Sequence, residues 1–176
     1  GVQLGHQKIF KRAREFKRIH KCKIGVVTFN PMPKMFFNKK LKNFKLMNLS
    51  QKINQFKKQK VDFLINQKFT KNFSKIKAKN FILKYLNKKI KTKILFVSNN
   101  FRFGNKREGD INLLRTYENK CHYKLIIPSP LKKNNKIISS TEIRKLLSNG
   151  NLSKANQYLS RKWEIEGKVQ KGRKVG

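Results

Sequence analysis

Amphipathic segments alternate with short apolar runs along this chain, and that alternation limits its fold more than any other feature. The apolar runs are rich in β-branched residues and are short enough to be buried strands. We expect helices at 6–20, 48–59, 77–89 and 110–119, each followed by a strand, at 23–29, 61–65, 93–97 and 123–127 respectively. This order predicts an α/β fold in which helices wrap a parallel sheet.

The first expected strand ends at a loop that contains two prolines. Pro31 and Pro33 cannot continue a ladder, so Asn30 to Pro33 forms a rigid loop at the carboxyl end of the strand. The following stretch, 34–44, is expected to be irregular, and it contains Phe36, Phe37 and Phe44. These rings could cover a flat aromatic ligand. A hydrophobic flap that packs on the core explains them equally well.

Gly5 and His6 stand at the start of the first expected helix. The free N–H groups and the dipole of a helix start attract phosphate, and a glycine lets the phosphate approach the backbone. His6 can donate a hydrogen bond to a phosphoryl oxygen as charge builds up. The alternative is a loop end with a surface histidine.

A second corner of this kind is expected where another helix opens after residue 138. Ser139, Ser140 and Thr141 offer hydroxyl and N–H groups there, and Arg144 follows one turn later. An ordinary helix cap with a solvated arginine is the alternative. This helix should end at 149–150, and Asn151 should start a short last helix through Leu159.

Two further stretches have a clear pattern. In 99–104, Phe101 and Phe103 alternate with Arg102, so the rings should point one way and the arginine the other. Residues 163–169 alternate as a strand would, and glycines then recur in a basic tail at 167, 172 and 176.

The formal net charge of +37 raises the possibility of a nucleic-acid-binding protein. The lysines, however, are spread over every segment, and no basic block stands apart from a neutral body. We therefore expect no specific nucleic-acid partner. No apolar run is long enough to span a membrane and no signal peptide is visible, so we expect a cytoplasmic protein with no membrane partner.

Several stretches, in the right order, resemble the FMN adenylyltransferase module of bacterial bifunctional riboflavin kinase/FAD synthetases. Residues 1–7 (GVQLGHQ) match an H-x-G-H region, 28–33 (TFNPMP) match T-F-x-P-x-P, 99–104 (NNFRFG) match an N-F-R-F-G-like stretch, 139–144 (SSTEIR) match S-S-T-x-I-R, and 167–172 match the first strand and turn of the kinase. The resemblance implies a Rossmann-like parallel sheet wrapped by helices, of the nucleotidyltransferase type.

The resemblance also implies a division of the chain. Residues 1–160 correspond to the adenylyltransferase domain, and 161–176 correspond to the beginning of the riboflavin kinase domain, with the first strand of its β-barrel. The family's strand before position 1 is absent from this sequence, which does not begin with Met. We expect no kinase activity from these residues alone, and an intact parent that also phosphorylates riboflavin.

The implied reaction transfers AMP from ATP to FMN, which gives FAD and pyrophosphate, with Mg²⁺ carried by ATP and no metal ligand on the protein. The implied catalytic residues are His6, Gln3 and Arg144, and the implied phosphate-binding residues are Gly5, His6, Ser139, Ser140, Thr141 and Arg144. The adenine and FMN loop would be Asn99, Asn100, Phe101, Arg102, Phe103 and Gly104, and the flavin loop Asn30, Pro31 and Pro33.

One departure from the family pattern is Gln3, which stands where the family has His. Glutamine cannot carry positive charge, and a lost charged donor typically costs roughly 10² or more in rate. Three alternatives therefore stay open: a sister nucleotidyltransferase on the same fold, a weakened flavin- or nucleotide-binding homologue, and a basic nucleic-acid-binding protein. Weak self-association is also possible.

Overall fold

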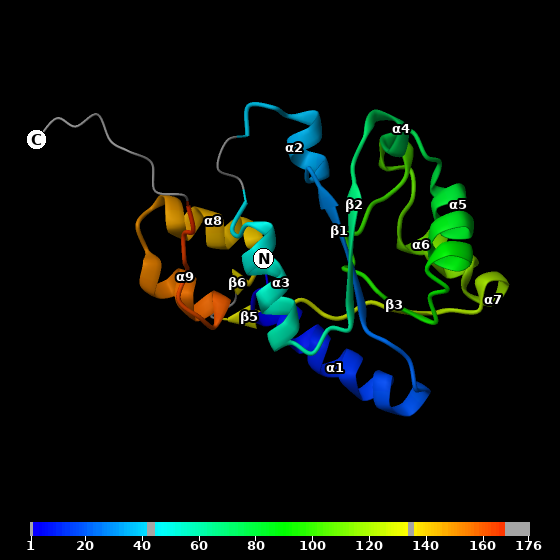
Figure 1. Ribbon diagram of the computed structural model, residues 1–176, viewed down its shortest axis with the longest axis horizontal. Coiled ribbons are helices and arrows are strands. Elements are labelled where there is room, and N and C mark those ends of the chain that lie inside the picture. Colours follow the sequence, from blue (N-terminus) through cyan, green and yellow to red (C-terminus); the bar gives the residue numbers. More distant parts are fainter. Residues whose placement is uncertain (1, 42–44, 134–135, 168–176) are drawn as a thin grey trace, which may run out of the picture.

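The computed structural model describes residues 2–41, 45–133 and 136–167 (Figure 1). The helices are α1 (Leu4–His20), α2 (Pro33–Phe37), α3 (Leu49–Lys58), α4 (Lys71–Ser74), α5 (Ala78–Asn80), the π-helix η1 (Phe81–Lys89), the 3₁₀ turn η2 (Asn105–Arg107), α6 (Ile111–Thr116), α7 (Glu118–Cys121), α8 (Ser140–Ser148) and α9 (Leu152–Leu159). The strands are β1 (Gly25–Asn30), β2 (Phe63–Lys68), β3 (Ile94–Phe96), β4 (Lys124–Ile126), β5 (Lys132–Lys133) and β6 (Lys136–Ile137). Among the helices of these residues, none is long and apolar enough to cross a membrane.

The strands confirm parallel pairing but not a single sheet. β1 pairs with β2 in parallel, with Val27 opposite Ile65, and β3 pairs with β4 in parallel, with Leu95 opposite Leu125. β5 and β6 form a separate antiparallel hairpin. The expectation of one continuous sheet is wrong for the described residues, because no strand among them lies between the two parallel pairs to connect their ladders.

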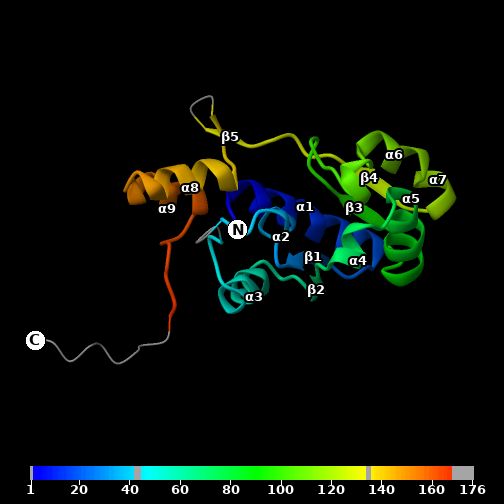
Figure 2. The same cartoon turned by 90° about the horizontal axis from the view of Figure 1, so that it is seen from above.

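Helix α1 packs against both parallel pairs (Figure 2). Phe10 contacts Phe56 of α3 edge to face, at 5.9 Å between ring centroids, in a cluster that also packs on Val26 of β1 and Leu64 of β2. Further along the helix, Phe16 contacts Phe96 of β3 at 6.0 Å. The helix therefore bridges two sheets that share no hydrogen bonds.

Two further clusters complete the core. One is built around η1, β3, β4 and α6 and includes Ile82 and Leu114, both fully buried. The other joins α8 and α9 through Ile143 and Tyr158 and takes in Leu46 from the segment before α3. Figure 1 shows these clusters on opposite sides of β1 and β2.

The helix caps anticipated from the sequence are confirmed. The side chains of Asn48, Asp110, Ser139 and Asn151 accept hydrogen bonds from the backbone N–H groups of Gln51, Leu113, Glu142 and Lys154. At α3, the Gln51 side chain also accepts from the N–H of Asn48, which completes a capping box.

Other expectations need correction. Residues 33–37, expected to be irregular after Pro33, form the short helix α2, because Pro33 at its first turn fixes a helical φ. The helix expected at 77–89 forms, but 81–89 winds as a π-helix. The helix expected at 110–119 divides at Tyr117 into α6 and α7.

No strand forms at 163–167, against the expectation of one from 163 to 169. The Trp163 N–H donates to Asn156 Oδ1 at 2.7 Å and its indole Nε1 donates to the Leu46 carbonyl at 3.1 Å. Gln51 Nε2 donates to the Glu164 carbonyl at 3.1 Å. The polar groups of this segment are thus bound by α9 and α3 instead of a neighbouring strand. Residues 168–176, including Gly172 and Gly176, lie outside the described part of the chain, as do Gly1 and Phe44.

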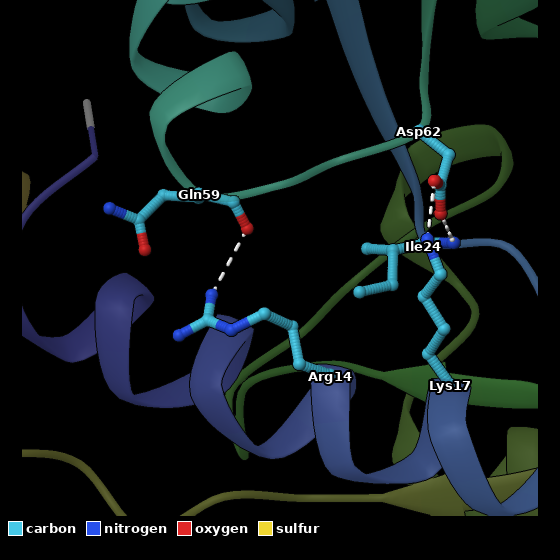
Figure 3. A network of polar contacts seen from close by, with 5 residues as sticks. All are labelled: Arg14, Lys17, Ile24, Gln59 and Asp62. Atoms are coloured by element: carbon cyan, nitrogen blue, oxygen red, sulfur yellow. Dashed lines mark hydrogen bonds and ion pairs between the residues drawn. The ribbon is translucent and has the colours of Figure 1, made fainter.

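Asp62, just before β2, connects that strand to α1 and to the start of β1 (Figure 3). Its Oδ2 accepts from the Ile24 N–H at 2.7 Å, and its Oδ1 lies 2.5 Å from Lys17 Nζ. Nearby, Arg14 Nη1 donates to the Gln59 carbonyl at 3.0 Å. The hydrogen bond from Lys17, followed by that from Ile24, lowers the pKa of Asp62 below its ordinary value of 3.8.

We predict that Asp62→Ala lowers the free energy of unfolding at pH 7 by about 1 to 2 kcal/mol, because the Ile24 N–H loses a charged acceptor. The lowered pKa means that the contribution is present above pH 3.8 and is lost as the pH falls through the folded-state pKa. Denaturant unfolding should therefore show a smaller difference between wild type and variant at pH 3 than at pH 7. Glu15→Ala, at an exposed acid of α1, is the control. A difference that is equal at both pH values would contradict this role for the carboxylate.

Candidate active site

Gln3 caps the start of α1 with its side chain. Its Oε1 accepts hydrogen bonds from the N–H groups of Gly5 and His6, the latter at 3.3 Å. The Gln3 side chain is buried, with 6% of the residue exposed. The N–H groups expected to be open to phosphate therefore already have a partner within the chain.

The space above Gly5 is also occupied. A Cβ at this position would lie 2.8 Å from Gln3 Oε1 and 3.3 Å from Gln3 Nε2. A glycine is thus required so that the carboxamide can fold over the helix start. This close approach is the one that the sequence led us to expect for a phosphate.

His6 is half-buried in the first turn of α1, so the alternative of a surface histidine at a loop end is not what the structure contains. Its Nδ1 is buried and has no hydrogen-bond partner among the described residues. Burial lowers the pKa of His6 from 6.5 to about 4, so the ring is neutral at pH 7. A neutral imidazole presents one donor and one acceptor to a ligand.

The second corner forms at the start of α8. Ser139 Oγ accepts from the Glu142 N–H at 3.1 Å and is the cap of this helix, while Ser140 and Thr141 occupy its first turn. Arg144 Nη1 donates to the Ser140 carbonyl at 3.1 Å, which holds the guanidinium over that turn. Arg144 is half-buried rather than solvated, and this burial lowers its pKa from its ordinary value.

The structure brings the two corners together. Gln3 Nε2 donates to the carbonyl of Ile138 at 3.1 Å, and Ile138 directly precedes Ser139. Leu4 packs against the cluster that contains Ile138 and Ile143. The starts of α1 and α8, which are far apart in sequence, are thereby joined by a buried polar contact and by apolar packing.

The proline loop at the end of β1 lies close to these corners. Asn30 Oδ1 accepts from Lys45 Nζ at 3.3 Å, and the next residue, Leu46, is buried in the same cluster as Ile138. The Asn30–Pro31 peptide bond is cis, and Pro33 begins α2.

A continuous series of aromatic contacts runs from the segment after this loop to the loop at 99–104. Phe36 contacts Phe69 at 5.2 Å, and Phe69 contacts Phe73 at 5.6 Å. The series continues through Phe81 to Phe103, at 6.4 and 5.6 Å between successive rings. Phe36 therefore packs as part of a hydrophobic flap.

Phe37 differs from its neighbour in exposure. Although its ring contacts Phe36 at 5.2 Å and Phe69 at 5.9 Å, 71% of the residue is exposed. Both earlier interpretations thus keep some support, since one ring packs on the flap and the next has a free surface for a flat ligand.

The loop at 99–104 has an inner and an outer side, as its alternation predicted. Phe101 stacks on the buried Phe103 at 5.5 Å, whereas Arg102 points away and pairs with Asp110 at 2.7 Å. Gly104 has a φ of +76°, and a Cβ there would lie 2.7 Å from the backbone of Ala78. Phe103 and Gly104 fix the loop to α5, while Asn99 and Asn100 are exposed.

Sequence reasoning missed two lysines near the proline loop. Lys45 contacts Asn30, and Lys52 is half-buried on α3. Burial, followed by the nearby charge of Lys45, lowers the pKa of Lys52. Such a pair attracts an anion. Nothing in the sequence distinguishes these two from the other cations among 45 Lys and Arg residues.

Among the described residues, no group of three or more His, Cys, Asp or Glu side chains is placed to hold a metal ion. A Mg²⁺ ion that keeps most of its waters and binds through substrate phosphates needs no such group. The residues present therefore fit a cation that arrives with a nucleotide.

We predict that Gly104→Ala destabilises the fold far more than Gly150→Ala. Both glycines have positive φ, +76° and +72°, but a Cβ at Gly150 would meet nothing within 4 Å. Gly150→Ala should cost about 1 kcal/mol of backbone strain, and Gly104→Ala at least about 2 kcal/mol more, because of its clash with Ala78. Thermal or denaturant unfolding measures both. Equal costs would show that the loop does not depend on this contact.

We predict that the free energy of unfolding falls by on the order of 1 kcal/mol between pH 6.5 and 5 because of His6. The unfolded chain takes up a proton below pH 6.5, whereas the folded site does not until about pH 4. His6→Asn should remove this part of the pH dependence, and His122→Asn, at an exposed position, is the matched control. An NMR titration in which His6 gains its proton near pH 6.5 would contradict the burial argument.

The comparisons with known proteins agree with this geometry. The family model of the FAD synthetases matches residues 1–142. A bifunctional riboflavin kinase/FMN adenylyltransferase of Buchnera aphidicola subsp. Acyrthosiphon pisum is 38% identical over 176 residues, which is 100% of this chain and 56% of that protein. The protein of the same name from Escherichia coli K12 is 30% identical over 176 residues, again 100% of this chain and 56% of the relative. This chain thus spans just over half the length of these relatives.

A crystal structure described as a macrolide-efflux protein from Streptococcus pneumoniae has a similar fold, with a TM-score of 0.79 and 25% identity. It covers 92% of this chain, which covers 61% of that one. The similarity supports the arrangement of helices and small parallel sheets described above. The family match covers both corners of the site up to the first turn of α8, and on that ground the chain belongs to the FAD synthetase family.

Proposed function

We propose that this chain is the FMN adenylyltransferase part of a larger protein and transfers AMP from ATP to FMN. The observation that carries the proposal is the junction of two phosphate-type corners, at the starts of α1 and α8, through the Gln3–Ile138 hydrogen bond. Membership of the FAD synthetase family supports the choice of substrates.

In the proposed reaction, an oxygen of the FMN phosphate attacks the α-phosphorus of ATP. The bond from that phosphorus to the bridging oxygen of the leaving group breaks, which releases pyrophosphate and leaves FAD. The phosphate of FMN is already ionised at pH 7, so no general base is needed. The work of the protein is to position the two phosphates and to stabilise the developing charge.

His6 and Arg144 carry this work in the proposal. The neutral His6 ring offers a donor from the first turn of α1, and Arg144 offers a guanidinium from α8. Gly5, Ser139, Ser140 and Thr141 line the helix starts on which the triphosphate would lie. Mg²⁺ would arrive with ATP and would neutralise part of its charge.

The flavin is proposed to lie by the proline loop. Asn30, Pro31 and Pro33 border this position, and the exposed ring of Phe37 offers a face for the isoalloxazine. The exposed Asn99 and Asn100, together with the rest of the loop through Gly104, would border the adenine and the FMN phosphate.

The remaining parts of the proposal concern the whole protein. Residues 1–160 would form the transferase domain and 161–176 the beginning of a riboflavin kinase domain, since the relatives named above are bifunctional and extend further. A strand before residue 1 would connect the β1–β2 and β3–β4 pairs into one sheet. We also propose a cytoplasmic protein without a specific nucleic-acid partner, and with at most weak self-association.

One rival function has a specific observation in its favour. Gln3 is fully engaged with the chain's own backbone and leaves no charged donor where the family has His. A homologue that binds flavin and nucleotide without turnover would also have these features.

We predict that the intact protein converts FMN and ATP to FAD in the presence of Mg²⁺, and that His6→Ala and Arg144→Ala each lower kcat/KM by roughly 10²-fold or more, because each removes a donor to developing phosphate charge. Chromatography of FAD measures the rate. Arg18→Ala, at an exposed arginine on the same helix as His6, is the matched control and should keep the wild-type rate.

The outcomes separate the candidates. FAD formation that is equal in wild type, His6→Ala and Arg144→Ala would place the chemistry elsewhere. ATP and FMN binding without FAD would support the weakened homologue, and Gln3→His would then be the next variant. Binding that depends steeply on salt and ignores ATP would support the nucleic-acid function.

A further inference from the structure

We infer that Gln3 is a positioning residue that couples the starts of α1 and α8, and that it is not a donor to the substrate. The inference rests on the proposed function, because the coupling matters for catalysis only if both helix starts hold the triphosphate. It concerns a position where this chain departs from the family pattern, so what the family residue does cannot be transferred to it.

Both ends of the Gln3 carboxamide are committed to the backbone. The oxygen accepts from the N–H groups of Gly5 and His6, and the nitrogen donates to the carbonyl of Ile138, 135 residues away. A carboxamide combines an acceptor with two donors on one planar group, which is what a bridge between N–H groups and a carbonyl requires.

The surroundings of Gln3 keep the carboxamide in place. Gln3 is 6% exposed and follows Val2, which is 2% exposed, so water does not readily replace a lost partner. Gly5 leaves room for the carboxamide, since any side chain there would overlap it. The sequence Gln-Leu-Gly is therefore consistent as a unit, with a reaching side chain, an apolar anchor and an open backbone.

The consequence for the site is geometric. The bridge fixes His6, which follows the cap on α1, relative to Arg144, whose guanidinium is held over the first turn of α8. A triphosphate between these two helix starts needs both groups at the correct separation at the same time. Loss of the bridge should weaken ATP binding while the donor groups themselves remain.

The test uses variants that remove one half of the bridge or both. Gln3→Glu keeps an oxygen to accept from Gly5 and His6 but cannot donate to Ile138 when ionised. Gln3→Leu removes both halves. Gly5→Ala keeps the carboxamide but displaces it. Gln7→Leu is the matched control, since Gln7 also stands in the first turns of α1 and donates to a distant carbonyl, that of Leu159 at 3.2 Å, without contact to α8.

The first readout is hydrogen exchange of single amides by NMR on the intact, unliganded protein. Gln3→Glu should lower protection about tenfold at Ile138 and Glu142 and leave Gly5 and His6 protected, because only one hydrogen bond is lost. Gln3→Leu should lower protection at all four amides, and Gln7→Leu at none of them. Unchanged protection of Ile138 and Glu142 in Gln3→Glu and Gln3→Leu would overturn the inference.

The second readout is the steady-state kinetics of FAD formation. Gln3→Leu should raise the KM for ATP about tenfold with a smaller change in the KM for FMN. Gly5→Ala should have the same effect, and the double variant should be no worse than either single one, because both changes break the same bridge. A fall in kcat at an unchanged KM for ATP would identify Gln3 as a direct donor and overturn the inference.

The two readouts keep this inference separate from the proposed function. Hydrogen exchange needs no substrate, so the bridge is tested even if the protein makes no FAD. A protein that makes FAD but loses no protection in the Gln3 variants retains the function and refutes the bridge.

Discussion

The packing of α1 is the constraint on which the rest of this structure depends. Its buried Phe10 packs with the β1–β2 pair, and its Phe16 reaches Phe96 on β3, so one helix holds together two sheets that share no hydrogen bonds. Asp62 secures the far end of the helix through Lys17. The near end is secured by Gln3, whose carboxamide joins it to the segment before α8. The position of the candidate site follows from how this helix is held at its two ends.

The chemistry of the site follows from the same packing. His6 is neutral because the helix start is buried, and Arg144 is held by the carbonyl of its own first turn. These groups come from opposite ends of the family match, residues 6 and about 140, and they meet only because α1 and α8 share one apolar cluster around Ile138. Phosphoryl transfer needs positioned donors more than it needs a reactive side chain, and this arrangement supplies positioned donors.

Local patterns in the sequence predicted much of this structure, and the failures have physical causes. Asn48, Asp110, Ser139 and Asn151 cap helices as expected, because capping depends on a few neighbouring residues. The alternation at Phe101 to Phe103 also predicted the correct sides of the loop. The strand at Trp163 failed because its polar groups found partners in α9 and α3, which no local pattern reveals. The role of Gln3 as a bridge depends on Ile138 and could not be read from its neighbours.

The central claim is that the α-phosphoryl group of ATP is transferred to FMN, and its fate can be followed directly. The intact protein would be incubated with FMN, Mg²⁺ and ATP labelled at either the α- or the γ-phosphorus. The account predicts that the α-label appears in FAD and the γ-label in pyrophosphate. A γ-label that passes to another acceptor, or an α-label that stays in ATP while both substrates are bound, would contradict it.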